Sequence, residues 1–347
     1  MIFSSSTSRL AIHESARIEA RCDARAGDVV VAEVLTEHAT YRHLECADGS
    51  MAELHVGDRI VGTLGSRQAL RGFVGSAPTE LTEGETLSLL NMGGVIGRFI
   101  DSTSSLGAPA TVRYIGTIVD EAGVVSLGRA AKPVRHPSAG SRPVVLAIGT
   151  CMHVGKTTTM AKLIEAATAA GFSVGAAKLA GVAALKDLTE FTNAGAVDVK
   201  SFLDCGLPST VDADDLAPVF ETVVDSLEGD LVIVELGDGI VGHYHVETVL
   251  RNAAAMADVA AVVLCAGDIV GAYGAKHCLD AMGIGITAIS GLATENVAGT
   301  AVIESWLGVP AVNGVKNPDQ LFSIVREAID GWTATRAAAA VAGGESA

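Results

Sequence analysis

The chain has 347 residues, 49% of them hydrophobic and 18% charged, and its formal net charge at pH 7 is −16. Binding to nucleic acid needs a basic surface, so this acidic balance predicts no nucleic-acid partner. The sequence has no run of about 18 apolar residues and no basic start followed by an apolar core, so we expect no membrane partner and a cytoplasmic location.

The length favours two domains, and the first covers residues 1–130. Short β-rich runs separated by Gly and Asp occupy 28–35, 58–65, 71–78, 110–120 and 123–130. This spacing predicts a small β-rich domain, either a barrel or a sandwich. Residues 131–143 contain three prolines and no hydrophobic period, and we interpret them as a linker.

From residue 144 to 332 apolar strands alternate with helical segments. Strands are expected at 143–149, 172–178, 230–239, 257–267, 283–291 and 308–315. Helices are expected at 157–171, 213–228, 244–256, 272–282, 296–307 and 318–331. This alternation predicts an α/β domain with a doubly wound, mostly parallel sheet covered on both faces. Residues 333–347 are expected to form a flexible tail.

A phosphate-binding loop is predicted at 149–159, between the first of these strands and the helix that follows. Backbone N–H groups and the positive end of a helix dipole converge at such a loop and suit an anion. Lys156 would reach the β- and γ-phosphates of ATP, and the Thr157 hydroxyl would hold Mg²⁺. The residues expected to bind the nucleotide here are Thr150, His153, Val154, Gly155, Lys156, Thr157 and Thr158.

The loop has Thr150 where GxxxxGK[ST] has its first Gly, and the Gly lies one position earlier. This arrangement resembles the P-loop NTPase superfamily of dethiobiotin synthetase and cobyrinic acid a,c-diamide synthase. Two later features match in order. Lys178 closes the second strand, where that family has a lysine facing substrate and phosphates, and VIVELGDG at 232–239 resembles the family's Val-x-Val-Glu-Gly-Ala-Gly-Gly. The resemblance covers about residues 144–330.

The resemblance implies specific roles. Lys156, Lys178 and Glu235 would be catalytic, and Thr157 and Glu235 would hold Mg²⁺. The resemblance also implies a homodimer. Asp238 is an acid that the family's motif lacks, and its place at the same edge of the sheet makes it a further candidate for Mg²⁺. The sequence departs from the family at Cys151 and Met152, which replace Asp-Thr in the loop, so we carry over the nucleotide chemistry and not the biotin-precursor substrate.

Other polar residues have structural alternatives. Asp187 is expected to cap a helix rather than contact substrate, and Asn296, with Thr294, is a candidate for contacting the base. The Gly-rich segment 91–97 is interpreted as a tight turn of the β domain. A solvated sheet face explains the cluster of His38, Tyr41, His43 and Glu45 without a metal. Other possible substrate contacts are His153, Asp204, His243, Tyr244 and His245.

These features favour an ATP- and Mg²⁺-dependent enzyme that phosphorylates the carboxylate or carbamate of a small molecule, as a ligase, cyclase or kinase. The alternative is a nucleotide-hydrolysing switch that acts on a protein partner through its β-rich domain. A third hypothesis places the chemistry in the β-rich domain itself. The guanine-reading sequence Asn-Lys-x-Asp is absent, which favours ATP over GTP.

Overall fold

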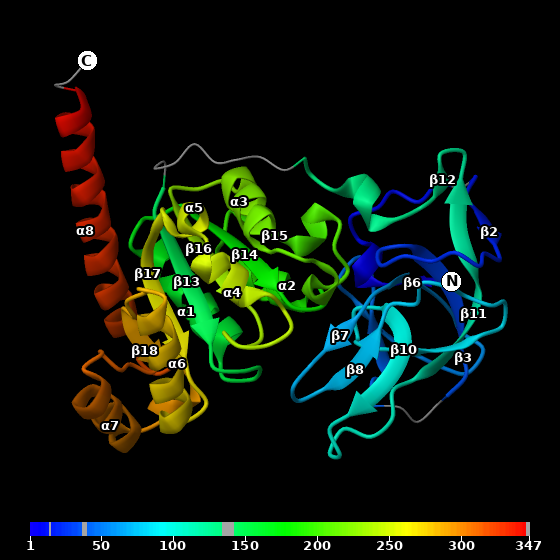
Figure 1. Ribbon diagram of the computed structural model, residues 1–347, viewed down its shortest axis with the longest axis horizontal. Helices are drawn as coiled ribbons and strands as arrows, with labels where there is room; N and C mark the ends of the chain where they lie inside the picture. Colours follow the sequence, from blue (N-terminus) through cyan, green and yellow to red (C-terminus); the bar gives the residue numbers. More distant parts are fainter. Residues whose placement is uncertain (14, 37–39, 134–141, 345–347) are drawn as a thin grey trace.

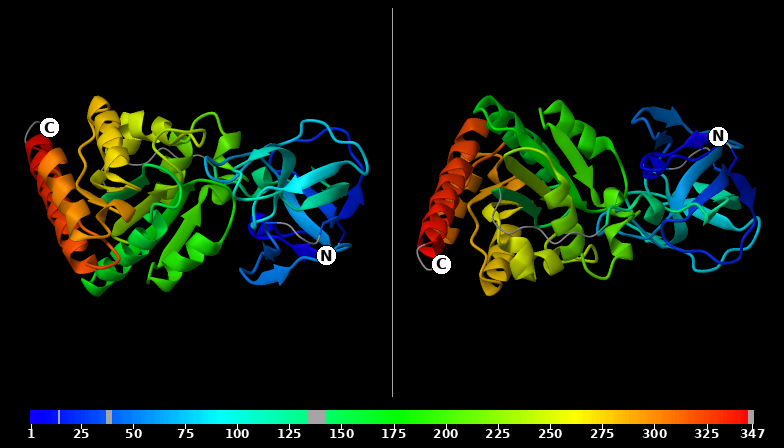
Figure 2. Two further views of the ribbon diagram at one scale, coloured as in Figure 1. Left: turned by 90° about the horizontal axis from the view of Figure 1, so that it is seen from below. Right: turned by 90° about the horizontal axis from the view of Figure 1, so that it is seen from above.

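A computed structural model describes residues 1–13, 15–36, 40–133 and 142–344. The chain forms a β-rich N-terminal domain and an α/β C-terminal domain, which lie side by side (Figure 1). The long helix α8 (Pro318–Gly344) lies on the side of the α/β domain remote from the β-rich domain in each view (Figures 1 and 2). Within the described residues, no helix is long and apolar enough to cross a membrane.

The N-terminal domain is built around a closed ring of strands. In the described residues β6 (Arg59–Leu64), β3 (Val29–Val34), β11 (Thr111–Asp120), β9 (Thr86–Leu89) and β10 (Val95–Ser102) pair in that order, and a parallel pairing of β10 with β6 closes the ring. Alternate residues of β3 point to opposite sides: Val30, Ala32 and Val34 pack with Leu64 and Ile96, whereas Val29 and Val31 belong to a second apolar cluster. The ring is therefore a small barrel whose wall is buried on both faces at β3.

Shorter strands extend this barrel: β1 (Ile2–Phe3), β2 (Arg17–Glu19), β7 (Arg67–Gln68), β8 (Phe73–Ser76) and β12 (Gly123–Val124). A separate pair consists of β4 (His43–Glu45) and β5 (Met51–Glu53). The predicted strand at 123–130 is wrong beyond Val124, because residues 127–130 form a 3₁₀ turn that begins where the Ser126 side chain accepts a hydrogen bond from the Gly128 N–H. Of the predicted linker at 131–143, residues 134–141 lie outside the described residues.

The C-terminal sheet has the strand order β15-β14-β16-β13-β17-β18, with every neighbouring pair parallel. Its strands are β13 (Val144–Gly149), β14 (Val174–Ala180), β15 (Asp198–Ser201), β16 (Leu231–Leu236), β17 (Val259–Cys265) and β18 (Ala288–Ser290). From β13 the chain passes to β14 and then to β15 at one edge of the sheet. It returns to β16, beside β13, and then continues on the other side of β13 to β17 and β18. This is the doubly wound arrangement, and ligands of such sheets bind at the carboxyl ends of the strands where the direction changes.

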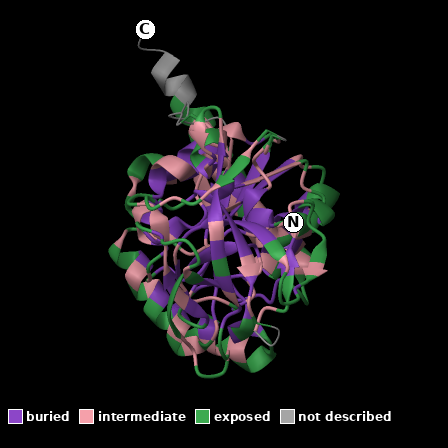
Figure 3. Ribbon diagram, turned by 90° about the vertical axis from the view of Figure 1, so that its right-hand side faces the viewer, coloured by how far each residue is buried: buried purple, intermediate pink, exposed green. Residues whose placement is uncertain are grey.

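Helices cover both faces of the sheet. Within β13 the side chains of Val144, Leu146 and Ile148 pack into one apolar cluster, and those of Val145 and Ala147 pack into the other. The first cluster includes α3 (Ala217–Ser226), α4 (Val246–Arg251), α5 (Ala253–Met256), α6 (Ile269–Ala281) and α7 (Val297–Leu307). The second includes α1 (Lys156–Ala169), α2 (Lys186–Asn193) and α8. Seen from the side of the β-rich domain, buried residues gather at the centre of the molecule and exposed residues lie at its rim (Figure 3).

Several predicted elements differ from the structure. The strand expected at 308–315 is reduced to a bridge between Ala311 and Ile289, because Gly308 ends α7 in a left-handed conformation and the Asn313 side chain accepts hydrogen bonds from the N–H groups of Val315 and Lys316. Strand β15 was not predicted, and helix α2 was expected only as the helix that Asp187 would cap. Residues 333–344 continue α8 as a helix, in which Arg336 pairs with Asp258 at 2.8 Å. That the segment 333–347 is flexible stays a prediction.

The two domains share an apolar contact and several polar ones. Val95 and Leu127 of the N-terminal domain pack with Ala183, Phe202 and Leu203 of the C-terminal domain. Beside this cluster, the Asn91 side-chain amide donates to the Ala183 carbonyl at 2.6 Å, and the Leu185 N–H donates to the Glu45 carboxylate at 2.7 Å. The segment after β14 is therefore attached to the barrel.

Candidate functional site

The phosphate loop lies where the sequence places it, between β13 and α1. β13 ends at Gly149 and α1 begins at Lys156, with Gly155 as its N-terminal cap residue. A Cβ at Gly149 would lie 2.8 Å from the Lys156 Cδ, so the lysine side chain needs a glycine at this position. This contact gives a reason why the first glycine of the loop stands at 149. The Thr150 hydroxyl accepts a hydrogen bond from the Gly267 N–H at 3.1 Å and so joins the loop to the end of β17.

The ammonium group of Lys156 is buried behind the loop. Its Nζ donates to the Cys151 carbonyl at 2.8 Å and to the Asp238 carbonyl at 2.6 Å, and the residue is 5% exposed. Burial lowers the pKa of Lys156, although nearby Glu235 and Asp238 favour the charged form. Desolvation of this kind strengthens the attraction between the ammonium and a phosphate that enters the loop.

Lys178 and Glu235 occupy paired positions on the neighbouring strands β14 and β16. The Lys178 Nζ lies 3.7 Å from the Glu235 Oε1 and also pairs with Asp187 in the first turn of α2. The prediction that Asp187 caps a helix is therefore wrong. Leu185 is the cap residue of α2, and the Asp187 carboxylate pairs with Lys178 instead.

Two buried carboxylates beside the loop have oxygens without a hydrogen-bond partner in the described residues. These are Oε2 of Glu235, which is 2% exposed, and both carboxylate oxygens of Asp238, which is 9% exposed. Burial raises the pKa of the Asp238 carboxyl group, while Lys156 opposes the shift. Unpartnered oxygens of this kind suit a hard divalent cation, and Thr157 lines the same space.

These residues fit Mg²⁺ better than a metal that needs a full set of protein ligands. No group of three or more His, Cys, Asp or Glu side chains in the described residues is arranged to hold a metal ion. Mg²⁺ takes one or two carboxylates together with water and nucleotide phosphates, so it does not require such a group. Glu235, Asp238 and Thr157 are the residues that would hold it.

A cavity of about 630 Å³ lies at the carboxyl edge of the sheet and is lined by both domains. The C-terminal domain contributes loop residues His153, Gly155, Lys156, Thr157 and Thr158, together with Lys178, Asp187, Glu235, Asp238 and Tyr244. The barrel contributes Tyr41, Arg67, Asn91 and Met92. The phosphate loop is thus one wall of a cavity whose other wall belongs to the N-terminal domain.

Other sequence candidates lie elsewhere. Asn296 caps α7, accepting hydrogen bonds from the N–H groups of Ala298 and Gly299, and Thr294 bonds to the Gly291 carbonyl; neither lines the cavity. Thr150 and Val154 also lie outside its lining, although both belong to the loop. Asp204 pairs with Arg9 at 3.0 Å and so serves the domain contact. That Asn296 contacts the base stays a prediction.

Sequence reasoning missed the barrel side of the cavity. The interpretation of Tyr41 and Glu45 as members of a solvated strand face is wrong: Tyr41 lines the cavity and Glu45 is buried against the segment after β14. His43 is exposed, and His38 lies outside the described residues. The turn predicted at 91–97 is present only at 91–94, because β10 begins at Val95, and the sequence did not show that Asn91 contacts the other domain. The sequence feature that could have identified these residues is the close spacing of polar side chains among short strands. That spacing does not indicate which domain the side chains face.

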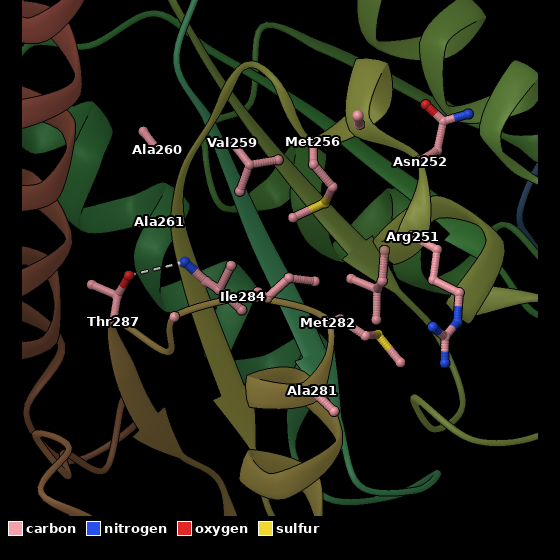
Figure 4. A pocket seen from close by; sticks show the side chains of 15 residues that line it. Arg251, Asn252, Met256, Val259, Ala260, Ala261, Ala281, Met282, Ile284 and Thr287 are labelled. Carbon is pink, nitrogen blue, oxygen red and sulfur yellow. Dashed lines mark hydrogen bonds between the residues drawn. The ribbon is translucent and has the colours of Figure 1, made fainter.

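A second cavity, of about 530 Å³, lies at the opposite edge of the sheet near the amino ends of β17 and β18 (Figure 4). Its lining includes Met256, Met282 and Ile284, and the Thr287 hydroxyl there accepts a hydrogen bond from the Val262 N–H. Arg251 is the charged residue of this lining, which contains no His, Cys, Asp or Glu. Groups for nucleotide or acid–base chemistry are gathered in the other cavity, which we take as the candidate functional site.

The sheet order, the loop between β13 and α1 and the buried Lys156 define the C-terminal domain as a P-loop NTPase fold. No family model matches the chain, and no curated protein does. Among solved structures, a DUF1611 family protein from Anabaena variabilis ATCC 29413 is similar over 60% of this chain and 65% of its own, with 13% identity and a TM-score of 0.38. Chloroplast FtsY from Physcomitrella patens matches 53% of this chain and 62% of its own, with 19% identity and a TM-score of 0.35.

The 54 kDa signal recognition particle protein of Aeropyrum pernix K1, whose structure contains GDP, is also similar. It matches 62% of this chain and 54% of its own, with 17% identity and a TM-score of 0.35. The chain therefore spans less than two thirds of the length of each of these three proteins.

Proposed function

We propose that the protein is an ATP- and Mg²⁺-dependent enzyme that transfers a phosphoryl group to the carboxylate or carbamate of a small molecule. The observation that carries the proposal is the cavity itself. A phosphate loop, two lysines and two buried carboxylates form one wall, and residues of the second domain form the other. Its volume of about 630 Å³ is in the range of pockets that hold small-molecule ligands.

The residues have distinct roles in this proposal. Lys156 neutralises charge on the transferring phosphoryl group. Lys178, which pairs with Asp187 and Glu235 near the end of β14, lines the same cavity and does the same. The metal supplies further charge neutralisation when bound. The attacking oxygen of the substrate would be positioned by groups of both domains, so most of the rate enhancement would come from orientation and electrostatics.

The resemblance to dethiobiotin synthetase and its relatives motivates acyl-phosphate chemistry, in which an amine or an internal nucleophile attacks the phosphorylated group. The absence of Asn-Lys-x-Asp from the sequence motivates ATP over GTP. The barrel residues that line the cavity together with the phosphate loop support a small-molecule enzyme over a switch that acts on a protein. A homodimer and a cytoplasmic location stay predictions.

The test is the release of ADP and phosphate from Mg²⁺-ATP, with and without fractions of a metabolite extract that passes a filter of about 1 kDa. We expect slow release alone and a large increase with one fraction. Equal release in every fraction, combined with an increase on adding cell protein, would replace the proposal with the nucleotide-dependent switch. Repeating the assay with Mg²⁺-GTP tests the choice of base.

A further inference from the structure

Arg67 of the barrel is a buried arginine that faces the cavity without an acidic partner. It lies in β7, is 9% exposed, and takes part in no ion pair within the described residues. Its Nη1 donates to the Tyr41 hydroxyl at 2.9 Å and to the Leu90 carbonyl. Both acceptors are neutral, and a buried charge that is not neutralised costs folding free energy. A ligand of opposite charge that binds in the cavity would explain why a buried arginine is present here.

The guanidinium group is held in a fixed position. Its Cζ lies 5.8 Å from the centre of the Tyr41 ring and 5.9 Å from that of Phe73, and aromatic faces attract cations at such distances. The residues on either side of Arg67 are bonded to the other domain. The Ser66 N–H donates to the Asp212 carboxylate at 2.9 Å, and the Gln68 N–H donates to the Tyr244 hydroxyl at 3.3 Å. These two hydrogen bonds hold the strand that carries Arg67 against the phosphate-loop domain.

The surroundings of Arg67 do not neutralise it. Both carboxylate oxygens of Asp238, whose charged form Arg67 favours, lack a hydrogen-bond partner, so Arg67 does not bond to them. Burial raises the pKa of Tyr244 to about 12, so its hydroxyl beside Arg67 stays uncharged at neutral pH. The lysines of the cavity differ, since Lys178 is paired with two carboxylates and Lys156 is bonded behind the phosphate loop.

We propose that Arg67 binds a carboxylate group of the small-molecule substrate and thereby orients the substrate between the barrel and the phosphate loop. A guanidinium group has five N–H donors, of which Nη1 uses two here, and the Tyr244 hydroxyl is a further neutral partner of Arg67. The planar group has further donors whose geometry matches the two oxygens of a carboxylate. The inference rests on the proposed function, because it assigns the substrate of that same cavity to the class of carboxylates. Arg67 is a specificity-determining residue that the phosphate-loop motif does not contain.

The test compares short aliphatic carboxylates, with and without an amino or hydroxyl group, with their primary amides. The readout is the midpoint of thermal unfolding of the full chain at saturating Mg²⁺ and a non-hydrolysable ATP analogue, titrated with each probe. We expect at least one carboxylate, and not its amide, to raise the wild-type midpoint. Arg67→Ala should weaken this effect about 10- to 100-fold, the range for loss of a charged hydrogen-bonded pair. Arg71→Ala, an exposed position four residues away, is the matched control and should change nothing.

Nucleotide affinity, measured with a fluorescent ATP analogue, separates the possible failures. If Arg67→Ala weakens nucleotide binding about 10-fold or more and leaves the carboxylate response intact, Arg67 binds nucleotide phosphate and the inference is overturned. It is also overturned if amides act as well as carboxylates, or if no carboxylate acts on the wild type. Arg67→Lys, which keeps the charge but loses the planar fork, provides the same comparison if Arg67→Ala does not fold. Normal turnover of Mg²⁺-ATP by Lys156→Ala would instead contradict the proposed function and leave the role of Arg67 standing.

Discussion

The Glu235 carboxylate and the Lys178 ammonium lie on directly paired residues of two parallel strands, 3.7 Å apart, yet the second oxygen of Glu235 has no hydrogen-bond partner in the described residues. That oxygen is the feature that distinguishes Glu235 from Asp187, which also pairs with Lys178. We predict that Glu235→Gln raises the Mg²⁺ concentration needed for half-maximal nucleotide binding about 10-fold or more, the range for loss of a group that supports a metal. Titration of Mg²⁺ at constant ATP analogue measures the change.

Asp187→Asn is the control for this prediction, because it removes a carboxylate from Lys178 without removing an unpartnered oxygen. It should leave the Mg²⁺ requirement within about 3-fold of the wild type. Equal shifts in both variants would mean that Glu235 acts only by holding Lys178, and the assignment of Glu235 to the metal would be wrong.

Lys156→Ala is expected to lower the turnover of Mg²⁺-ATP about 100- to 1,000-fold, since it removes a charged donor from the transferring phosphoryl group. Burial lowers the pKa of this lysine, so its charge does not favour the fold, and we expect the thermal midpoint to stay within about 4 °C of the wild type. Steady-state ADP release and thermal unfolding measure the two effects. Lys162→Ala, on the surface of the same helix and paired with Glu165, is the control and should retain turnover.

The phosphate loop was predictable because its signal is contiguous. An apolar strand, Gly155-Lys156-Thr157 and a helix follow one another within a short segment, and the structure places them in that order. Lys178 and Glu235 were predictable for a related reason. Each lies near the carboxyl end of an apolar strand, although β14 continues beyond the predicted end at Lys178 to Ala180, and the parallel sheet brings such strand ends to one edge.

The barrel side of the cavity was not predictable from local pattern. Arg67 belongs to a strand of two residues, which is too short to show an alternation, and Tyr41 lies outside any strand. Their position over the phosphate loop depends on contacts between domains, such as that of Ser66 with Asp212, which are 146 residues apart in sequence. A pattern within about ten residues carries no information on such a contact.

Asp238→Asn tests the cost of the buried carboxylate. Burial raises the pKa of Asp238 above its ordinary value of 3.8, so the charged form is less favourable in the folded protein than in the unfolded one. The buried charge therefore destabilises the folded protein most above the raised pKa. This destabilisation decreases as the pH falls through the raised pKa and vanishes below 3.8. Without Mg²⁺, the variant should therefore unfold at higher urea concentration than the wild type at neutral pH, and this difference should shrink in acid.

Asp214→Asn, at an exposed position, is the control for this pH series and should change the urea midpoint little at any pH. A stability gain in Asp238→Asn that grows as the pH falls would have the wrong sign for a carboxylate destabilised by burial. In the presence of Mg²⁺ and ATP analogue the order should reverse, because the wild-type carboxylate then has a cation beside it.

Gly93→Ala tests whether close contact of the two domains is needed for turnover. A Cβ at Gly93 would lie 1.9 Å from the Ala183 carbonyl oxygen, so either the turn at 91–94 or the segment after β14 must move. We expect a loss of about 1–3 kcal/mol in the free energy of unfolding, the usual cost of overpacking, measured by urea titration. ADP release stimulated by the active metabolite fraction should fall further than nucleotide affinity, because the barrel wall of the cavity is displaced while the phosphate loop is not.

Gly274→Ala is the control for this prediction. The position is exposed on α6 with nothing within 4 Å of the added Cβ, so the variant's free energy of unfolding should rise by up to about 1 kcal/mol and its activity should stay complete. Should Gly93→Ala lose stability but retain stimulated turnover, the cavity would not need the barrel in its observed position.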